Sequence, residues 1–417
     1  MNIAELILLP GLILLAAVEA VLAAAVLRAL LRQPAPLPED KDCPRVAVIL
    51  PLRGADPSLR ACLAALLDQD YPDYHVHAVL DSREDPAWSM VTALAEGEDG
   101  NRITVHVLDA IPETCSLKCA GLAQVLATLD KTVAFAVLLD ADVVPSRRWL
   151  RGITGRLRQS GAAAMSGIRW FIPRGLGAAA LIRYVWNAAS VVQMYRHGIA
   201  WGGCLAITRE VFEGTDMLER LRHAYGEDTV LDAVLRAHGL RLEFDPTLVM
   251  LSREDTTPAA LTDWACRQLF SVRLHHSGWY RILVFGLLQF FLVLACAALI
   301  VQSLWAGDWM QAGVVVVTLL GYELLQVSLL LTGETLVRRH IDEGEATRPV
   351  VSFKNALVLL AAIPVAQVLH GIVLIMAQLA RTVTWRGVTY RLEGKGGIRL
   401  LSYTPYVQDR SDRNHSL

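Results

Sequence analysis

The sequence predicts an α/β domain with a mostly parallel sheet, held at a membrane by one N-terminal and about three C-terminal apolar segments. The 417 residues are 54% hydrophobic and only 19% charged, whereas roughly a quarter of the residues of an average soluble domain are charged. The apolar residues gather in four runs of bilayer length. Between the first two runs, strand-like and helix-like segments alternate, which indicates βαβ units.

Charge and cysteine content exclude several classes of protein. The chain has 39 Lys and Arg against 41 Asp and Glu, a net charge of −2, so we expect no nucleic-acid partner that is held by bulk positive charge. Its seven Cys include no C-x-x-C pair, and the spacing of Cys115 and Cys119 is not that of zinc ligands. Reduced, structural thiols are therefore expected.

The four apolar runs are Leu6–Leu27, Ile282–Trp305, Met310–Thr332 and Ala356–Ala380. No basic residue precedes the first run, while Arg28 and Arg32 follow it, which is the reverse of a secretory signal. Basic flanks stay in the cytoplasm, so residues 1–33 are predicted to be an anchor whose C-terminal end is inside. Basic residues before the second run agree, and residues 34–281 are expected to face the cytoplasm.

The fourth run is ambiguous. Pro364 and His370 interrupt it, and basic residues between Arg381 and Arg399 follow it. A single crossing would place this basic tail outside, against the positive-inside rule, so the sequence favours a re-entrant hairpin over one crossing. The expected divisions are an anchor (1–33), the α/β domain (34–260), an amphipathic helix at the membrane surface (261–281), a C-terminal membrane region (282–380) and a basic cytosolic tail (381–417).

Hydrophobic periodicity predicts the elements of the domain. The expected strands are Val46–Leu50, His75–Leu80, Ile103–Leu108, Val133–Leu139, Ala162–Trp170, Trp201–Ile207 and Arg241–Phe244. The expected helices are 57–69, 86–96, 118–129, 176–195 and 228–238. Ligands bind beyond the carboxyl ends of parallel strands, where Asp81 and the pair Asp140 and Asp142 are found.

Asp140 and Asp142 follow the apolar strand Val133–Leu139. Two carboxylates at this spacing present hard oxygen ligands to one Mg²⁺ or Mn²⁺ ion, whose open positions substrate phosphates can fill. The alternative is a pair of acids that caps a turn. Their place at the end of a central strand favours the metal site.

Glu227 and Asp228 open a predicted helix. One interpretation is an N-cap with an acid that suits the helix dipole. The other is a carboxylate at a pocket edge that acts as a general base on a hydroxyl. Both can hold, because a capping residue is rigidly placed.

Several other residues have a functional and a structural interpretation. Arg267 and Arg273 either lie at the membrane surface as snorkelling cations or clamp a diphosphate. Lys118 either meets a phosphate or begins a solvated helix. The turn Trp201–Gly203 permits close backbone approach or the stacking of a sugar, or is purely structural.

Ionisable groups inside the apolar runs form another set of candidates. Glu19, Glu323 and His370 lie there. Such groups are functional candidates by default, although pairing between helices explains them equally well.

In this order the candidates resemble the motifs of membrane-bound family 2 glycosyltransferases with the GT-A fold. The matching features are a βαβ start with Pro51 and Arg53, then Asp81, Lys118, Asp140-Ala-Asp142, Gly202-Gly203 and Glu227-Asp228. The chain is most similar to the branch with ceramide glucosyltransferases and bacterial hopanoid-type glycosyltransferases, and Thr384–Tyr390 looks like the C-terminal sequence of the bacterial members. The likeness covers roughly residues 40–280.

The resemblance implies roles for these residues. The segment 48–51 and Asp81 would meet the uridine, Asp140 the nucleotide sugar, and Asp142 the metal and diphosphate. Asp228 would be the base of an inverting transfer, with Glu227 beside it.

The family's QxxRW-like motif, which holds the diphosphate, has its nearest match in Trp264-Ala-Cys-Arg267-Gln268. Arg is kept there, but Trp replaces Gln and Gln replaces Trp. An alternative register gives the role to Arg273.

The resemblance thus implies a metal-dependent transfer of a sugar from a UDP-sugar to the hydroxyl of a sphingolipid-, hopanoid- or glycerolipid-like membrane lipid. The donor would bind on the cytoplasmic side, and the bacterial branch implies a bacterial inner membrane. The alternatives are a processive polysaccharide synthase, which needs a channel, a non-catalytic UDP-sugar-binding membrane protein, and a transporter.

Overall fold

A seven-stranded sheet forms the centre of the domain in the computed structural model, which describes residues 3–33, 36–97, 100–173, 177–341, 356–394 and 396–406. The strand order is β3-β2-β1-β4-β6-β5-β7. The strands are β1 (Val46–Leu52), β2 (Tyr74–Leu80), β3 (Ile103–Val107), β4 (Phe135–Leu139), β5 (Ala164–Phe171), β6 (Cys204–Thr208) and β7 (Leu242–Ser252).

The sheet is mostly parallel, which confirms the predicted α/β class. β1 pairs in parallel with β2 and β4, β2 with β3, and β5 with β7, while β6 runs antiparallel to both β4 and β5. Val46 begins β1 opposite Tyr74 and Phe135. The carboxyl ends of β1, β2 and β4 therefore meet at one edge, where the predicted strand-end acids gather.

Helices cover both faces of this sheet, because alternate strand residues point to opposite sides. They are α2 (Leu59–Leu67), α3 (Pro86–Ala95), α4 (Leu117–Leu126), α5 (Trp149–Ser160), α6 (Ala178–His197), α7 (Arg209–Glu213), α8 (Met217–Leu221) and α9 (Glu227–Ala237). α2, α3 and α5 pack on one face with Val48 and Leu50, and α4, α8 and α9 pack on the other with Ile49. Helix α5 was not predicted from the sequence, although its buried residues Trp149 and Ile153 have helical spacing.

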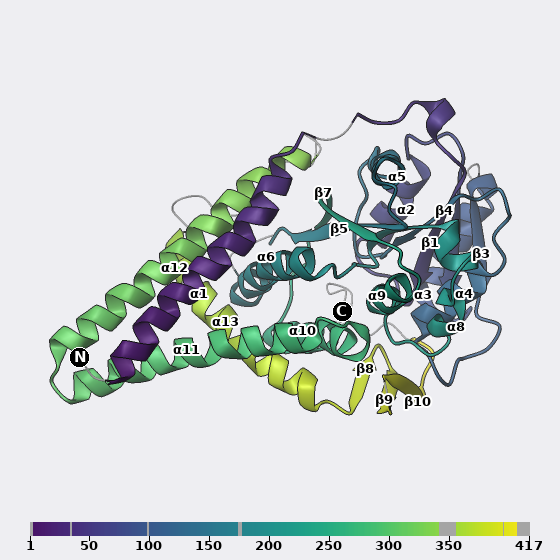
Figure 1. Cartoon of the computed structure of the whole chain (residues 1–417). Coiled ribbons are helices and arrows are strands. Elements are labelled where there is room, and N and C mark those ends of the chain that lie inside the picture. The colour runs from purple at the N-terminus through teal and green to yellow at the C-terminus, as the bar shows by residue number, and fades with distance from the viewer. Residues whose placement is uncertain are drawn as a thin grey trace.

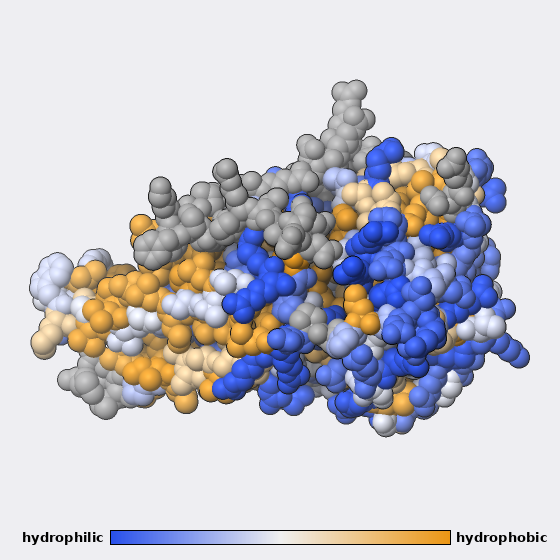
Figure 2. Space-filling view, turned by 90° about the horizontal axis from the view of Figure 1, so that it is seen from above, coloured by the Kyte–Doolittle hydropathy of each residue, from blue (hydrophilic) through white to orange (hydrophobic). Residues whose placement is uncertain are grey.

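In the described part of the chain, four helices are long and apolar enough to cross a bilayer, so the protein is an integral membrane protein. They are α1 (Ile3–Leu30), α11 (Trp279–Trp305), α12 (Trp309–Val337) and α13 (Ala356–Leu379). In Figure 1, α1, α11 and α12 extend away from the α/β domain, and α1 runs beside α12. The apolar surface gathers over these helices and the hydrophilic surface over the domain (Figure 2).

The fourth apolar run is one continuous helix, so the favoured hairpin was wrong. Pro364 lies inside α13 without ending it. The first half of α13 shares a buried cluster with the domain-side ends of α1 and α12, where Leu359 meets Leu30 and Val337. Its second half packs against α10 and the start of α11. The two ends of α13 thus lie near the domain-side ends of the other membrane helices, while its middle packs deeper, where Gln367 donates to the Tyr322 hydroxyl of α12 at 3.4 Å.

The predicted surface helix 261–281 is divided in the structure. Helix α10 spans Pro258–His275, and Thr257 caps it by accepting a hydrogen bond from the Ala260 amide at 3.2 Å. The chain then breaks, and α11 begins at Trp279. The helix starts earlier than expected because this Thr-Pro pair is an N-cap followed by an N1 proline.

The expected basic tail forms a second, three-stranded antiparallel sheet, and its residues 395 and 407–417 lie outside the described part. The strands are β8 (Thr382–Trp385), β9 (Val388–Glu393) and β10 (Gly397–Tyr403). Val388 and Tyr390 belong to the buried cluster of α4 and α9, and the Tyr390 hydroxyl accepts a hydrogen bond from the Leu117 amide at 3.1 Å. The tail is therefore part of the domain and lies on its side of the membrane.

Truncating the buried Val388 tests this packing. Val388 is fully buried, so Val388→Ala is expected to destabilise the protein by about 2 kcal/mol through lost contacts and a residual cavity. The thermal midpoint in detergent should fall. The control Leu401→Ala removes a side chain that is 48% exposed and should leave the midpoint nearly unchanged. Equal midpoints for both variants would contradict an integral tail sheet.

Candidate active site

Lys118 joins two of the predicted acids. It lies in the first turn of α4, and its Nζ is 2.8 Å from Asp140 Oδ1 at the end of β4. The same Nζ is 2.6 Å from Oε1 of Glu227, which begins α9. Burial opposes the charge of Lys118, but the acids around it hold its pKa well above the ordinary value. Lys118 therefore fixes the start of α9 against the carboxyl edge of the sheet.

The turn Trp201–Gly203 brings the backbone against these acids. A Cβ on Gly202 would fall on the Glu227 carboxylate, and one on Gly203 would lie 2.7 Å from Asp140 Oδ2. The Gly202 amide donates a hydrogen bond to Asp228 Oδ2 at 3.2 Å. Both glycines are thus required by close approach to side chains of the protein itself.

Asp228 has the properties of a general base. Burial, together with the neighbouring charge of Glu227, raises the pKa of Asp228 to about 7. A base whose pKa is close to the working pH abstracts protons efficiently. Glu227 is 2% exposed and paired with Lys118, so the structure gives it a positioning role beside Asp228.

Asp142 forms an ion pair with Arg169, which the sequence analysis overlooked because it lies within an apolar strand, β5. Among the described residues, Asp142 Oδ1 is buried without a hydrogen-bond partner. Glu254 lies near it, and burial together with the charge of Asp142 raises the pKa of Glu254 to about 8. Burial works against ionisation of Asp140, but Lys118 and then Arg169 hold its pKa below the ordinary value.

These features fit one divalent cation. Asp142 offers a hard oxygen without a partner among the described residues, and a further cation there would offset the burial and negative charge that raise the pKa of Glu254. In the described part of the chain, however, no three His, Cys, Asp or Glu side chains are gathered as a complete ligand set. Substrate phosphates would have to supply the other ligands.

Arg53 and Asp81 are paired with each other, and both contact the tail sheet. The Arg53 guanidinium also donates to the Arg386 and Thr404 carbonyls at 2.6 Å, and the Tyr403 hydroxyl donates to Asp81 Oδ2 at 2.8 Å. All three nitrogens of Arg53 are used within the protein. In this arrangement Arg53 joins the tail sheet to the carboxyl edge of the main sheet, and the substrate-binding role that the resemblance implies for it stays a prediction.

Pro51 lies in β1, opposite Val79 of β2, near the carboxyl edge that these side chains share. It is half-buried there.

Arg386 is a further residue that the sequence analysis did not assign. It pairs with Asp56, with Nη1 3.3 Å from Oδ2, and stacks on the rings of Trp385 and Tyr406. Burial opposes its charge, but Asp56 raises the pKa of Arg386 above the ordinary value. Its φ of 45° is rare for a side chain larger than glycine, and in this turn the guanidinium contacts Asp56 and the Arg53 carbonyl. The sequence signal was the Arg-Gly pair of the C-terminal motif.

The two arginine candidates for the diphosphate have different surroundings. Arg273 donates to the carbonyls of Ala377 and Ala380 at 2.6 and 2.7 Å, so it caps the end of α13 and is not directed at the acids. Burial, together with the charge of Arg386, lowers the pKa of Arg267. Because Arg273 is engaged at a helix end, Arg267 is the candidate of the two that stays a prediction for the diphosphate.

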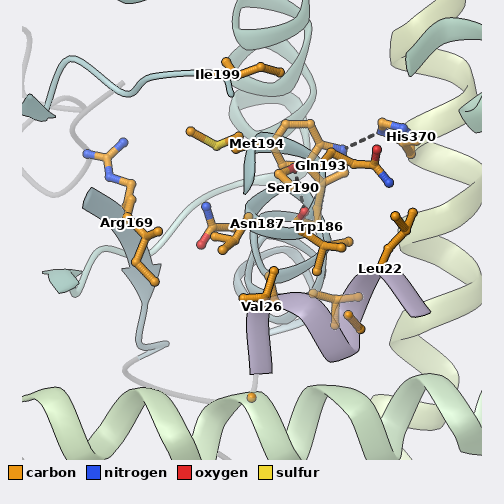
Figure 3. A pocket seen from close by; sticks show the side chains of 18 of the residues that line it. Leu22, Val26, Arg169, Trp186, Asn187, Ser190, Gln193, Met194, Ile199 and His370 are labelled. Atoms are coloured by element: carbon orange, nitrogen blue, oxygen red, sulfur yellow. Dashed lines mark hydrogen bonds between the residues drawn. The ribbon is translucent and has the colours of Figure 1, made fainter. Parts of the chain in front are cut away.

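A cavity of about 300 Å³ opens beside Asp228 and continues between the membrane helices. Residues of the acid site that line it are Arg169, Trp201 and Asp228, and α10 adds Trp264 and Gln268. Figure 3 shows Arg169 on one side of the pocket, Leu22 and Val26 of α1 on another, and Trp186 between Arg169 and His370. Trp186 donates to His370 Nδ1 at 3.1 Å, so this His370 nitrogen pairs with a helix of the domain.

The acid-rich edge of the sheet is thus flanked by fixed cations and open to the cavity between the membrane helices. The chain belongs to glycosyl transferase family 21, whose family model matches residues 11–398. This confirms the predicted resemblance to glycosyltransferases, and a sugar-nucleotide donor follows from the class.

A 53-residue stretch is 42% identical to the ceramide glucosyltransferase of Pyricularia oryzae, and this match spans 12% of the chain and 11% of that relative. Two solved structures are also similar. One is the mannosyltransferase PcManGT from Pyrobaculum calidifontis in complex with GDP-Man and Mn²⁺, with 18% identity over 89% of this chain and 98% of that one and a TM-score of 0.46. The other is a mycobacterial protein, with 16% identity, coverage of 57% of this chain and 78% of that one, and a TM-score of 0.38.

Replacing Arg386 tests the contribution of the tail sheet to the donor site. Arg386→Ala removes a positive charge and leaves Asp56 buried and unpaired, so kcat/KM for the sugar-nucleotide donor should fall by about tenfold or more. Initial rates over a range of donor concentrations measure this. The exposed Arg391 of β9 offers a matched control, and a similar rate loss in Arg391→Ala would contradict a specific role.

The pH dependence of the reaction tests Asp228. A base must be deprotonated, so kcat/KM should fall on the acid side with an apparent pKa near 7. Glu227→Gln removes a negative charge that raises the pKa of Asp228, and the acid limb should therefore move to lower pH. Glu219→Gln, an exposed change on α8, should leave the limb in place. An acid limb that Glu227→Gln leaves unmoved would argue against this coupling.

Proposed function

We propose that the protein transfers a sugar from a UDP-sugar to a hydroxyl of a membrane lipid, with inversion and with the help of a divalent cation. The observation that carries the proposal is the cavity that joins Asp228 to the interior of the membrane region. A soluble acceptor would not need such an extension.

The lining of the cavity supports a lipid acceptor. Below Asp228 the walls are formed mainly by apolar side chains of α1, α6, α11 and α12, such as Leu22, Val26, Val191 and Phe285. Hydrocarbon is stabilised by such surfaces. A growing polysaccharide would need a polar channel, so the lining favours a lipid product over a secreted polymer.

Asp228 would carry the proton transfer. It would take the proton of the lipid hydroxyl as that oxygen bonds to the anomeric carbon of the sugar, while the bond from this carbon to the diphosphate breaks and UDP leaves. The Gly202 amide holds one Asp228 oxygen and the Thr229 amide holds the other, at 3.2 and 2.7 Å. The base is therefore oriented before substrate binds, which lowers the entropic barrier.

The donor would lie along the carboxyl edge of the sheet. Asp81 Oδ1 is buried without a hydrogen-bond partner among the described residues and is an acceptor suited to the N–H of uracil. Asp142, with Asp140, would hold the cation, which supplies charge stabilisation to the leaving diphosphate. Arg267 and Arg386 would add fixed positive charge on the same side.

The basic residues at the domain-side helix ends support a cytoplasmic location of the domain. Arg28 lies in the last turn of α1 and Arg32 follows it, Arg338 and Arg339 follow α12, and Arg281 lies in the first turn of α11. Under the positive-inside rule this end faces the cytoplasm. The bacterial branch of the resemblance suggests a bacterial inner membrane.

Product analysis with an Asp228 variant tests the proposal. Purified protein, Mn²⁺, a panel of radiolabelled UDP-sugars and a total lipid extract should yield a labelled lipid. Asp228→Asn should lower turnover by about a thousandfold, because general-base catalysis contributes typically 10²–10⁴-fold, while UDP binding stays nearly unchanged. The exposed Asp263 on α10 provides the control Asp263→Asn. A long labelled polymer, or no product with any UDP-sugar, would contradict the proposal, and wild-type turnover in Asp228→Asn would remove this residue from the base role.

A further inference from the structure

The end of the cavity that lies farthest from Asp228 is polar. Glu19, Gln289, Gln326 and Gln367 line it, and they come from four different helices, α1, α11, α12 and α13. The walls between them and the acid site are largely apolar.

These polar side chains lie near the centre of the membrane. Glu19, Gln326 and Gln289 each lie about ten residues from the domain-side end of their helix. These ends are Leu30 of α1, Val337 of α12 and Trp279 of α11. At the helical rise of ~1.5 Å per residue, ten residues correspond to ~15 Å. The hydrocarbon core of a bilayer is ~30 Å thick. Ionisable and polar groups at the centre of the bilayer are rare, and where they occur they typically belong to binding sites or ion pathways.

Among the described residues, the hydrogen bonds between the helices leave acceptors over on two side chains, Gln367 and the neighbouring Glu323, of which only Gln367 lines the cavity. Gln326 donates to Glu19, and Gln289 and Gln367 donate to the Tyr322 hydroxyl at 3.0 and 3.4 Å. Gln367 is only 8% exposed, and its Oε1 has no hydrogen-bond partner in the described part of the chain. A device that merely joined helices would pair its polar atoms with one another, because an orphaned group is costly in hydrocarbon.

We infer that this end of the cavity is a subsite for a hydroxyl in the apolar body of the acceptor lipid, with Gln367 Oε1 as its hydrogen-bond acceptor. The inference rests on the proposed function, since it takes the cavity to hold the acceptor. The acceptor would then be a lipid with one hydroxyl at its head, beside Asp228, and a second hydroxyl deep in its tail. Plain hydrocarbon would leave Gln367 unpaired.

Two alcohols that differ by one hydroxyl test the subsite. Octadecan-1-ol and the 1,8-, 1,12- and 1,16-isomers of octadecanediol are compared in two assays on the purified full chain: equilibrium binding of the tritiated alcohol, and sugar transfer to it. At least one diol should bind about five- to tenfold more tightly than octadecan-1-ol, the effect of roughly one buried hydrogen bond, and should show the same gain in kcat/KM.

Gln367→Leu should abolish this preference and leave transfer to octadecan-1-ol nearly unchanged. Gln367→Met, which keeps an unbranched side chain and so disturbs packing less than Leu, should likewise abolish the diol preference and keep transfer to octadecan-1-ol. The matched control is Gln302→Leu, an exposed position on α11 outside this cavity, and it should keep the preference.

The outcomes separate the inference from the proposed function. Transfer to all alcohols without any preference for a diol would overturn the subsite, with water filling the deep end, and leave the proposed function standing. A binding preference that Gln367→Leu removes, without transfer to any alcohol or to a total lipid extract, would support the subsite and overturn the proposed function. A preference that survives both Gln367 variants would also overturn the subsite.

Discussion

The position of the Lys118 ammonium between Asp140 and Glu227 is the constraint on which the rest of the site depends. Asp140 ends a strand of the sheet and Glu227 begins a helix more than eighty residues later, so this one cation fixes two remote segments together. Like charges this close would otherwise repel each other. The same contact sets the place of Asp228, whose raised pKa follows from burial beside Glu227. Arg169 at Asp142 and Arg386 at Asp56 repeat the arrangement on the donor side.

The membrane helices contribute to the site as well as anchoring it. The cavity beside Asp228 passes from a charged edge, where electrostatic interactions are strong because water is scarce, into apolar walls that suit hydrocarbon. Helix α13 closes the boundary between the two, since it packs against α6 and α10 on one side and α11 and α12 on the other. An amphiphilic acceptor placed there would bring its head to Asp228 while its tail stays in the bilayer.

Local patterns were sufficient to predict the sheet, the strand-end acids and the helix that Glu227 and Asp228 begin, because apolar runs and their ends are local features. They could not reveal partners that only tertiary structure brings together. Arg386 lies about 330 residues from Asp56. The sequence allowed Arg273 either to lie at the membrane surface or to clamp a diphosphate, and in the structure its hydrogen bonds to the α13 carbonyls hold it at the end of that helix. Hydropathy predicted the length of α13 correctly. It carries no information on how a helix is oriented in the membrane, so the single helix was mistaken for a hairpin.

The most direct test of the account is an electron cryomicroscopy structure of the Asp228→Asn protein with Mn²⁺, a UDP-sugar and the acceptor lipid bound together. The account predicts the diphosphate beside Asp142 and Arg267, and the lipid inside the cavity with its accepting oxygen within hydrogen-bond distance of residue 228. A nucleotide at the sheet edge with the lipid bound on an outer face of the helices, remote from residue 228, would contradict it.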